Sequence, residues 1–103
     1  MGEAHPVAVV ADAERPDRSR LLLRGRVTVA SAARLREAAL AAVASGRDVT
    51  VDCAAAEHLD VSALQILIAL GREVFAAGRQ CDVAGVPPAV AELFRLAGLG
   101  GAG

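Results

Sequence analysis

The sequence predicts an α/β fold, with one domain built from a small mixed β-sheet and helices packed against it. Its 103 residues are close to the commonest size of a single domain. Strand-like and helix-like segments follow one another in the order ββαβαβα, without an internal repeat or a long linker. A helix that connects two strands of one sheet makes them parallel, whereas the first two strands are close enough in sequence to pair antiparallel. We therefore expect residues 1–103 to form one domain, with flexible ends at residues 1–6 and 100–103.

Four segments have the composition and alternation typical of strands, namely residues 7–10, 20–24, 48–53 and 80–86. Cys53 and Cys81 both fall in these segments, and they do not form a CxxC motif. We expect two buried, unreactive thiols in a reducing compartment, in place of a disulfide or a metal site.

The first helix is expected over residues 29–45, where apolar residues recur at helical spacing. Thr28 or Ser31 is a candidate for its N-cap, and Gly46 for its end. The last helix begins at a pair of prolines, which suits the first turn of a helix. Its Phe94 is expected to face the core.

The second helix is expected between Asp60 and Gly78. One side is apolar and should pack on the sheet; it consists of Leu64, Leu67, Ile68, Gly71, Val74 and Phe75. The opposite side consists of Ser62, Gln65, Ile66, Ala69 and Glu73. We expect Ser62 and Ile66 to be accessible to solvent on this second side. Asp60 should be the N-cap, accepting a hydrogen bond from the N–H of Ser62 or Ala63.

Two interpretations of the start of this helix are open. Asp60 and Ser62 are ordinary first-turn residues, so they could serve only to begin the helix, and Ile66 could be one of the scattered apolar residues of any protein surface. Alternatively, the helix presents the Ser62 hydroxyl, with an apolar residue one turn away, to a partner.

Composition excludes several function classes. The formal net charge is −1, from 11 basic and 12 acidic residues, so no electrostatic footprint for a nucleic acid is present. Aromatic residues make up 2% of the chain, and both phenylalanines are expected to face inward, which leaves none to stack on bases. The start of the chain lacks the pattern of a signal peptide, and the longest apolar run is too short to span a bilayer. We expect a cytoplasmic protein with no membrane insertion, no cofactor and no metal.

Three motifs occur in order along the chain: a strand ending in "VDC", then Asp-x-Ser-x-Leu opening an apolar helix, then "GVPPAVAELFRLAGL" leading into the last helix. In this order and spacing the sequence resembles the STAS domain family, the fold of bacterial anti-sigma factor antagonists. The resemblance is clearest over residues 20–99.

The resemblance implies a phospho-switched binding module. Ser62 aligns with the serine or threonine that family members have phosphorylated, and Asp60 with the acidic residue before it. The implied partners are a serine kinase that also acts as an anti-sigma factor and a PP2C-type phosphatase. The docking face would be formed by Gln65, Ile66, Ala69 and Glu73.

Two further classes of function are open. Short STAS proteins also occur as accessory subunits of lipid-transporting ABC systems and as signalling scaffolds, and these would use the same helix face without phosphorylation. An enzyme is the third class, but Ser62 is not in a G-x-S-x-G motif, and neither His5 nor His58 has an evident orienting partner in the sequence. We expect no catalytic residue.

Overall fold

The computed structural model describes residues 6–11, 15–96 and 100–101. Its elements, in chain order, are β1 (Val7–Ala11), β2 (Arg18–Val27), the short 3-10 helix η1 (Val29–Ser31), α1 (Ala32–Ala44), β3 (Asp48–Leu59), α2 (Val61–Ala76), β4 (Cys81–Ala84), α3 (Pro88–Leu96) and β5 (Gly100–Gly101).

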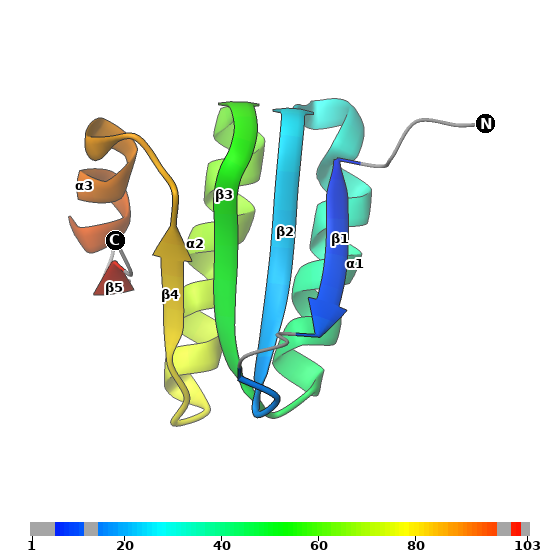
Figure 1. Cartoon of the computed structure of the whole chain (residues 1–103), viewed down its shortest axis with the longest axis vertical. Coiled ribbons are helices and arrows are strands. Elements are labelled where there is room, and N and C mark those ends of the chain that lie inside the picture. The colour runs from blue at the N-terminus through cyan, green and yellow to red at the C-terminus, as the bar shows by residue number, and fades with distance from the viewer. Residues whose placement is uncertain (1–5, 12–14, 97–99, 102–103) are drawn as a thin grey trace.

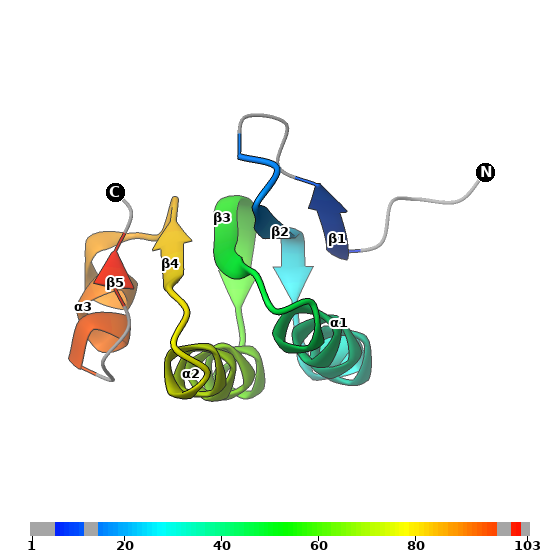
Figure 2. The ribbon, with the colours of Figure 1, turned by 90° about the horizontal axis from the view of Figure 1, so that it is seen from below.

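The sheet is mixed, and its strands lie in the same order as in the chain, from β1 to β5. β1 and β2 are antiparallel, while the pairs β2–β3, β3–β4 and β4–β5 are parallel. α1 and α2 both cover one face of the sheet, and α3 lies beside β5, at the edge of the sheet far from β1 (Figures 1 and 2). The predicted α/β domain, its order of elements and its mixed sheet are therefore confirmed.

Parts of the two segments that are expected to be flexible ends belong to the described residues. Gly100–Gly101 forms β5, a two-residue strand in parallel register with Asp82 and Val83. At the other end, the carbonyl oxygen of Pro6 accepts a hydrogen bond from the N–H of Arg24 at 2.9 Å. The remaining residues of the two expected flexible ends, 1–5 and 102–103, lie outside the described residues.

β3 is twice as long as its predicted segment, because it continues through residues 54–59 to Leu59. This continuation pairs with the second half of β2, across two shifts in register. Its sequence "AAAEH" has low strand propensity and is not predicted as a strand, and pairing with β2 overrides this local preference. The extended β3 carries the chain to Asp60, directly before α2.

The face of the sheet under α1 and α2 holds the core. Its completely buried side chains come from alternate strand positions and from the two helices, and include Leu21, Leu23, Val49, Val51, Leu35, Leu67 and Val74. Phe94 of α3 is also buried, as predicted. Cys53 and Cys81 are buried and unpaired, as predicted, and burial raises the pKa of their thiols to about 12 and about 11. No helix of the described residues is both long and apolar enough to cross a membrane.

The opposite face of the sheet carries charged residues on neighbouring strands. Arg18 of β2 is buried; its Nη1 donates to Thr50 Oγ1 at 2.8 Å and to Asp82 Oδ2 at 3.1 Å, and its Nη2 lies 3.8 Å from Asp48 Oδ2. These four side chains, Arg18, Asp48, Thr50 and Asp82, are called the Arg18 cluster below. They tie β2, β3 and β4 together.

A second ion pair on the same face joins Arg20 of β2 to Asp52 of β3. The Asp52 carboxylate accepts a hydrogen bond from the backbone N–H of Ala54 at 3.0 Å and from the Arg20 guanidinium, with the Nε donor at 3.1 Å. These donors, the Ala54 N–H foremost, hold the pKa of Asp52 below its usual value of 3.8.

Gly85 allows the chain to pass close to β3 directly after β4 ends. Gly85 has φ +77°, and a Cβ at this position would lie 2.5 Å from the backbone nitrogen of Ala54. Any larger residue here would be strained and would also collide with β3. The chain therefore leaves β4 in contact with β3 and turns into α3.

Candidate functional site

The start of α2 lies where the sequence predicts it, but the Asp60 side chain does not make the predicted capping hydrogen bond. α2 begins at Val61, so Ser62 is the second helical residue. Asp60 occupies the N-cap position with extended backbone, yet its side chain accepts no capping hydrogen bond. One carboxylate oxygen of Asp60 instead lies 3.8 Å from Nε2 of His58. His58 thus has an acidic neighbour that the sequence did not reveal, while His5 lies outside the described residues.

The Ser62 hydroxyl is turned inward, in contrast to the prediction that it faces solvent. The residue as a whole is half-buried, but its Oγ is buried and has no hydrogen-bond partner among the described residues. An unpaired buried hydroxyl costs about 1–3 kcal/mol. The N-terminal turn of α2 therefore holds a polar group that the fold does not satisfy.

The buried stripe of α2 is displaced from the predicted one. Its buried residues are Ala63, Leu67, Leu70, Gly71 and Val74, so the stripe begins one residue earlier than Leu64. Leu64 and Ile68 are consequently half-buried at its flank, and Phe75, predicted to face the core, is 77% exposed. Leu67, Gly71 and Val74 belong to both the predicted and the observed stripe, so the buried face is rotated by less than the 100° that separates successive residues. This rotation brings Ile66 to the opposite flank of the stripe, where it is half-buried toward α1.

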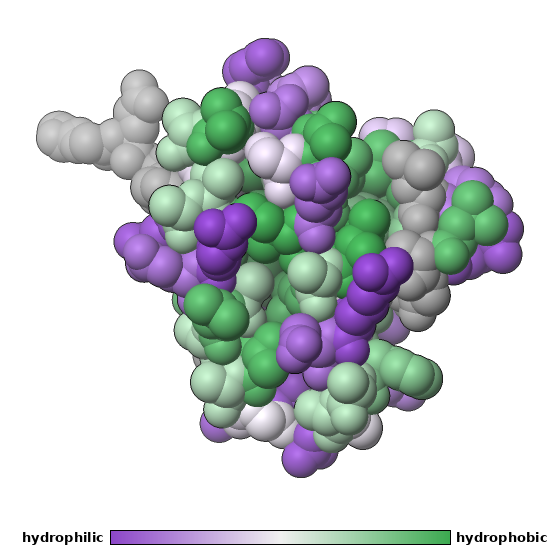
Figure 3. All heavy atoms as spheres, turned by 180° about the vertical axis from the view of Figure 1, so that it is seen from behind, coloured by the Kyte–Doolittle hydropathy of each residue, from purple (hydrophilic) through white to green (hydrophobic). Residues whose placement is uncertain are grey.

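α1 and α2 lie side by side, and between them runs a groove of about 390 Å³. Figure 3 views the molecule from the helix-covered side and shows apolar side chains gathered in a central hollow with hydrophilic ones around it. The groove is lined by Ala32, Arg36, Ala39, Leu40 and Val43 of α1 and by Ser62, Gln65, Ile66, Ala69, Leu70 and Glu73 of α2. We call this set the α1–α2 groove.

The groove contains every predicted docking residue of α2, together with Ser62. Gln65, Ala69 and Glu73 are exposed on its rim, and Ile66 forms part of its apolar floor. The sequence missed the half contributed by α1. A signal for it was present in Leu40, an apolar residue outside the buried stripe of α1 that is 64% exposed.

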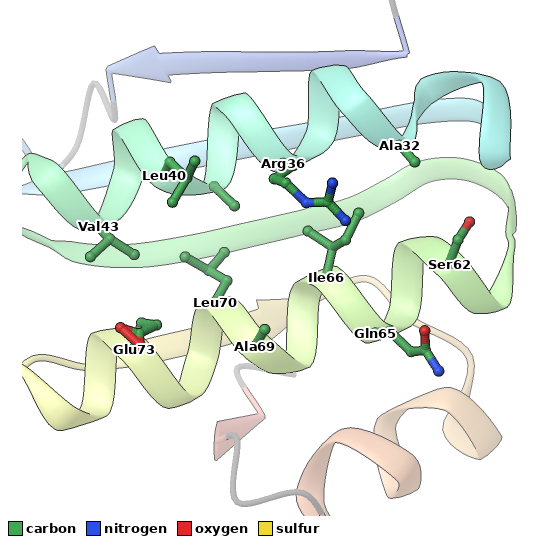
Figure 4. Close-up of a pocket in the computed structure, with 11 residues that line it drawn as sticks. Ala32, Arg36, Leu40, Val43, Ser62, Gln65, Ile66, Ala69, Leu70 and Glu73 are labelled. Carbon is green, nitrogen blue, oxygen red and sulfur yellow. The ribbon is translucent and has the colours of Figure 1, made fainter.

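Two charged side chains line the α1–α2 groove. Arg36 extends from α1 toward α2 and ends beside Ile66, near the Ser62 end, whereas Glu73 lies toward the other end (Figure 4). The Arg36 guanidinium has no hydrogen-bond or ion-pair partner among the described residues. Beyond the Ser62 end, Val29 of η1 and Val61 of α2 are 70% and 65% exposed, which extends the apolar surface.

Other chemistry is not assembled around Ser62. Among the described residues, no group of three or more His, Cys, Asp or Glu side chains is placed to hold a metal ion. The two buried cysteines lie in the sheet, and their raised pKa values keep them as neutral thiols near pH 7. What the site offers is an apolar groove with a serine at one end and, over its floor, an arginine that pairs with none of the described side chains.

The sequence matches a family model described as "Mlab, STAS domain" over residues 10–101. A search of curated protein sequences finds no match. The fold is similar to the unphosphorylated form of the anti-sigma factor antagonist SpoIIAA, with a TM-score of 0.78 and 13% identity, covering 94% of this chain and 87% of that chain.

Two further solved structures have similar folds. The phosphorylated form of the Bacillus cell fate determinant SpoIIAA gives a TM-score of 0.71 at 16% identity, covering 89% of this chain and 85% of that chain. A substituted form of RsbS from Moorella thermoacetica gives a TM-score of 0.70 at 21% identity, covering 95% and 86%. The similarities to these solved structures concern the fold alone. The family model for the STAS domain matches the sequence over all of the elements from β2 to α3. The chain belongs to the STAS domain family.

Proposed function

We propose that this protein is a non-enzymatic regulatory module that binds a protein partner in the α1–α2 groove and is switched by phosphorylation of Ser62. The observation that carries the proposal is that Ser62 and the docking residues Gln65, Ile66, Ala69 and Glu73 line one groove. The partner suggested by the STAS resemblance is a serine kinase that also acts as an anti-sigma factor, with a PP2C-type phosphatase to reverse the modification.

The composition of the groove suits a protein partner. Its floor is aliphatic, and Leu40 exposes 64% of its surface at the rim. Exposed apolar surface bordered by polar residues is typical of interaction sites, because a partner can remove it from water. Side chains at the centre of such a surface, here Ile66, are the positions where most binding energy is usually concentrated.

The position of Ser62 suits a charge switch. A phosphate there lies in the first turn of α2, where free N–H groups and the helix dipole favour an anion by about 0.3–1 kcal/mol. The Asp60 carboxylate opposes this by a comparable, screened amount. Because the Oγ is turned inward, the hydroxyl must rotate about χ1 to reach a kinase, which is an ordinary side-chain motion. SpoIIAA, which has a similar fold, exists in an unphosphorylated and a phosphorylated form.

A binding titration against the partner that copurifies from the native host tests the proposal. We expect phosphorylation of Ser62 to weaken binding at least tenfold, about 1.4 kcal/mol, and Leu40→Asp to weaken it similarly, because both place charge in the groove. Phe75→Asp is the matched control: it also replaces an exposed apolar residue but lies outside the groove lining, so affinity should not change. Equal affinity of the unmodified and phosphorylated forms would reject the switch. An equal loss of affinity in Leu40→Asp and in Phe75→Asp would reject the groove as the binding site.

A second candidate is favoured by the inward position of the hydroxyl. A STAS accessory subunit of a lipid-transporting ABC system, or a signalling scaffold, would dock through the same groove with Ser62 never modified. The buried Oγ, which has no hydrogen-bond partner among the described residues, fits a residue packed at a permanent interface. Mass spectrometry of the protein purified from its host distinguishes the candidates, because a subunit of this kind stays unphosphorylated and copurifies with a permease or ATPase.

A further inference from the structure

We infer that Arg36 pairs with the phosphate carried by Ser62, so that phosphorylation holds the Arg36 guanidinium across the α1–α2 groove and covers its apolar floor. The inference rests on the proposed phosphorylation of Ser62 and adds a device within this chain. The switch would then act by closing the docking groove, in addition to placing charge at its end.

The two side chains face the same groove from opposite helices. Arg36 projects from α1 toward α2 and ends beside Ile66, while Ser62 stands one turn earlier on α2 (Figure 4). Four residues of α-helix span about 6 Å along the axis. A change of rotamer in the long arginine side chain, added to the length of a phosphoserine, covers this separation.

Arg36 is available for the role because no side chain of the described residues holds it. It is exposed, and its guanidinium has no hydrogen-bond or ion-pair partner among the described residues. The acidic residue of the groove, Glu73, stands seven residues after Ile66 on α2, about 10 Å along the axis. The other acidic group near the start of α2 is Asp60, whose carboxylate lies beside His58 at 3.8 Å.

The other nearby arginines are less well placed. Arg34, on another face of α1, lines a separate recess with Val7, Ala8, Val9, Glu37 and Ala38. Arg26 is exposed at the end of β2 and has His58 as its register partner on β3. Arg26 is outside the groove lining. An experiment must still test whether Arg26, in place of Arg36, pairs with the phosphate.

The chemistry of the pair is that of a strong charge-assisted contact. A phosphoserine carries about −1.5 to −2 charges at pH 7, and a guanidinium donates two parallel hydrogen bonds to a phosphate. Such a pair anchors the arginine at both ends, on α1 and at the start of α2. The Arg36 side chain then lies across the groove between Ile66 and Ser62, where a partner's side chain would otherwise insert.

The test uses the full chain with phosphoserine incorporated at position 62 by codon reassignment, so that neither a kinase nor a partner is needed. Phosphorus NMR follows the second ionisation of the phosphate, whose pKa is about 6 when unperturbed. A neighbouring cation favours the dianion and lowers this pKa. We expect Arg36→Gln to raise the phosphate pKa by about half a unit or more, and the charge-matched control Arg34→Gln to leave it unchanged.

Two results would overturn the inference. The first is the same phosphate pKa in the parent and in Arg36→Gln, and the second is a rise produced by Arg26→Gln alone, which would assign the phosphate to the end of β2. Because Arg36 is exposed, loss of fold is not expected, and the circular dichroism spectra of the variants check this. The result is independent of partner binding, so failure of the proposed partner switch and failure of the arginine contact are distinguished.

Discussion

Arg18 is buried and Ser62 is half-buried, and each has a buried polar atom without a hydrogen-bond partner among the described residues, Nε in Arg18 and Oγ in Ser62. Arg18 nevertheless has partners on two neighbouring strands through its Nη atoms. Ser62 has no side-chain partner at all among those residues. The Arg18 guanidinium thus stabilises the fold through its partners, whereas the Ser62 hydroxyl makes no such contribution through the described residues.

The difference follows from where the two residues lie. Arg18 faces Asp48, Thr50 and Asp82 across parallel strands, so the sheet that positions it also supplies its partners. Ser62 stands at the start of a helix and beside an apolar groove, where the described part of the chain supplies no such partner. A polar group retained at a cost to stability, next to a surface suited to docking, is a signal of function.

Removing the Arg18 guanidinium should have the largest effect on stability. Arg18→Met keeps the length of the side chain but leaves the Asp48 and Asp82 carboxylates without their cation. Breaking a buried pair by removing one partner costs about 3–5 kcal/mol, and since both carboxylates are partly exposed we expect about 3 kcal/mol here. Urea unfolding measures the change. Arg95→Met, which removes an exposed pair with Glu92, is the control and should cost less than about 1 kcal/mol; similar losses from both variants would contradict the structural role of the Arg18 cluster.

Asp52 should show an intermediate effect that depends on pH. Its pKa in the folded protein is held below 3.8 by the Ala54 N–H and by Arg20, so its contribution is present above about pH 4 and is lost as the pH falls through the lowered value. We expect Asp52→Asn to cost about 1–2 kcal/mol at pH 7, and the difference from the parent to shrink below pH 3.8. Urea unfolding at pH 7 and at low pH provides the measurement. If the difference in the free energy of unfolding between the parent and Asp52→Asn stayed constant with pH, the charge of Asp52 would not be what stabilises the sheet.

Ser62 should show the smallest effect, and of opposite sign. Ser62→Ala removes a buried hydroxyl that makes no hydrogen bond to a described residue and introduces the best helix former. We expect the free energy of unfolding to stay the same or to rise by up to about 1 kcal/mol. A loss of more than 1 kcal/mol in urea unfolding would show that the hydroxyl has a structural partner after all, and would remove the contrast with Arg18.

Much of the fold could be predicted from the sequence because apolar periodicity governs which face of each element is buried. The order of elements, the start of α2 at residue 61 and the burial of Phe94 all follow from it. Periodicity has limited angular precision, however. Six apolar positions of α2 fit a stripe from Leu64, yet the sheet and α1 bury the one from Ala63, and Phe75 is exposed as a result.

The site could be predicted only in part, because half of it comes from another helix. The spacing on α2 brings Ser62, Ile66 and Glu73 to one side, and the structure places them in one groove. That Arg36 and Leu40 complete this groove depends on how α1 and α2 pack on the sheet, which no local pattern specifies. The inward rotamer of Ser62 and the contact of His58 with Asp60 are likewise tertiary outcomes.

The identical order of the strands in the chain and in the sheet has a consequence for how the molecule folds. Each strand pairs with the one that precedes it, after a single turn or a single helix, so no strand has to wait for a distant segment to insert between two others. Loop closure is short at every step, which favours rapid folding for a sheet whose pairs are mostly parallel. During synthesis the sheet can grow at one edge as the chain leaves the ribosome, with β1 and β2 as its first pair and the groove completed as soon as α2 has emerged.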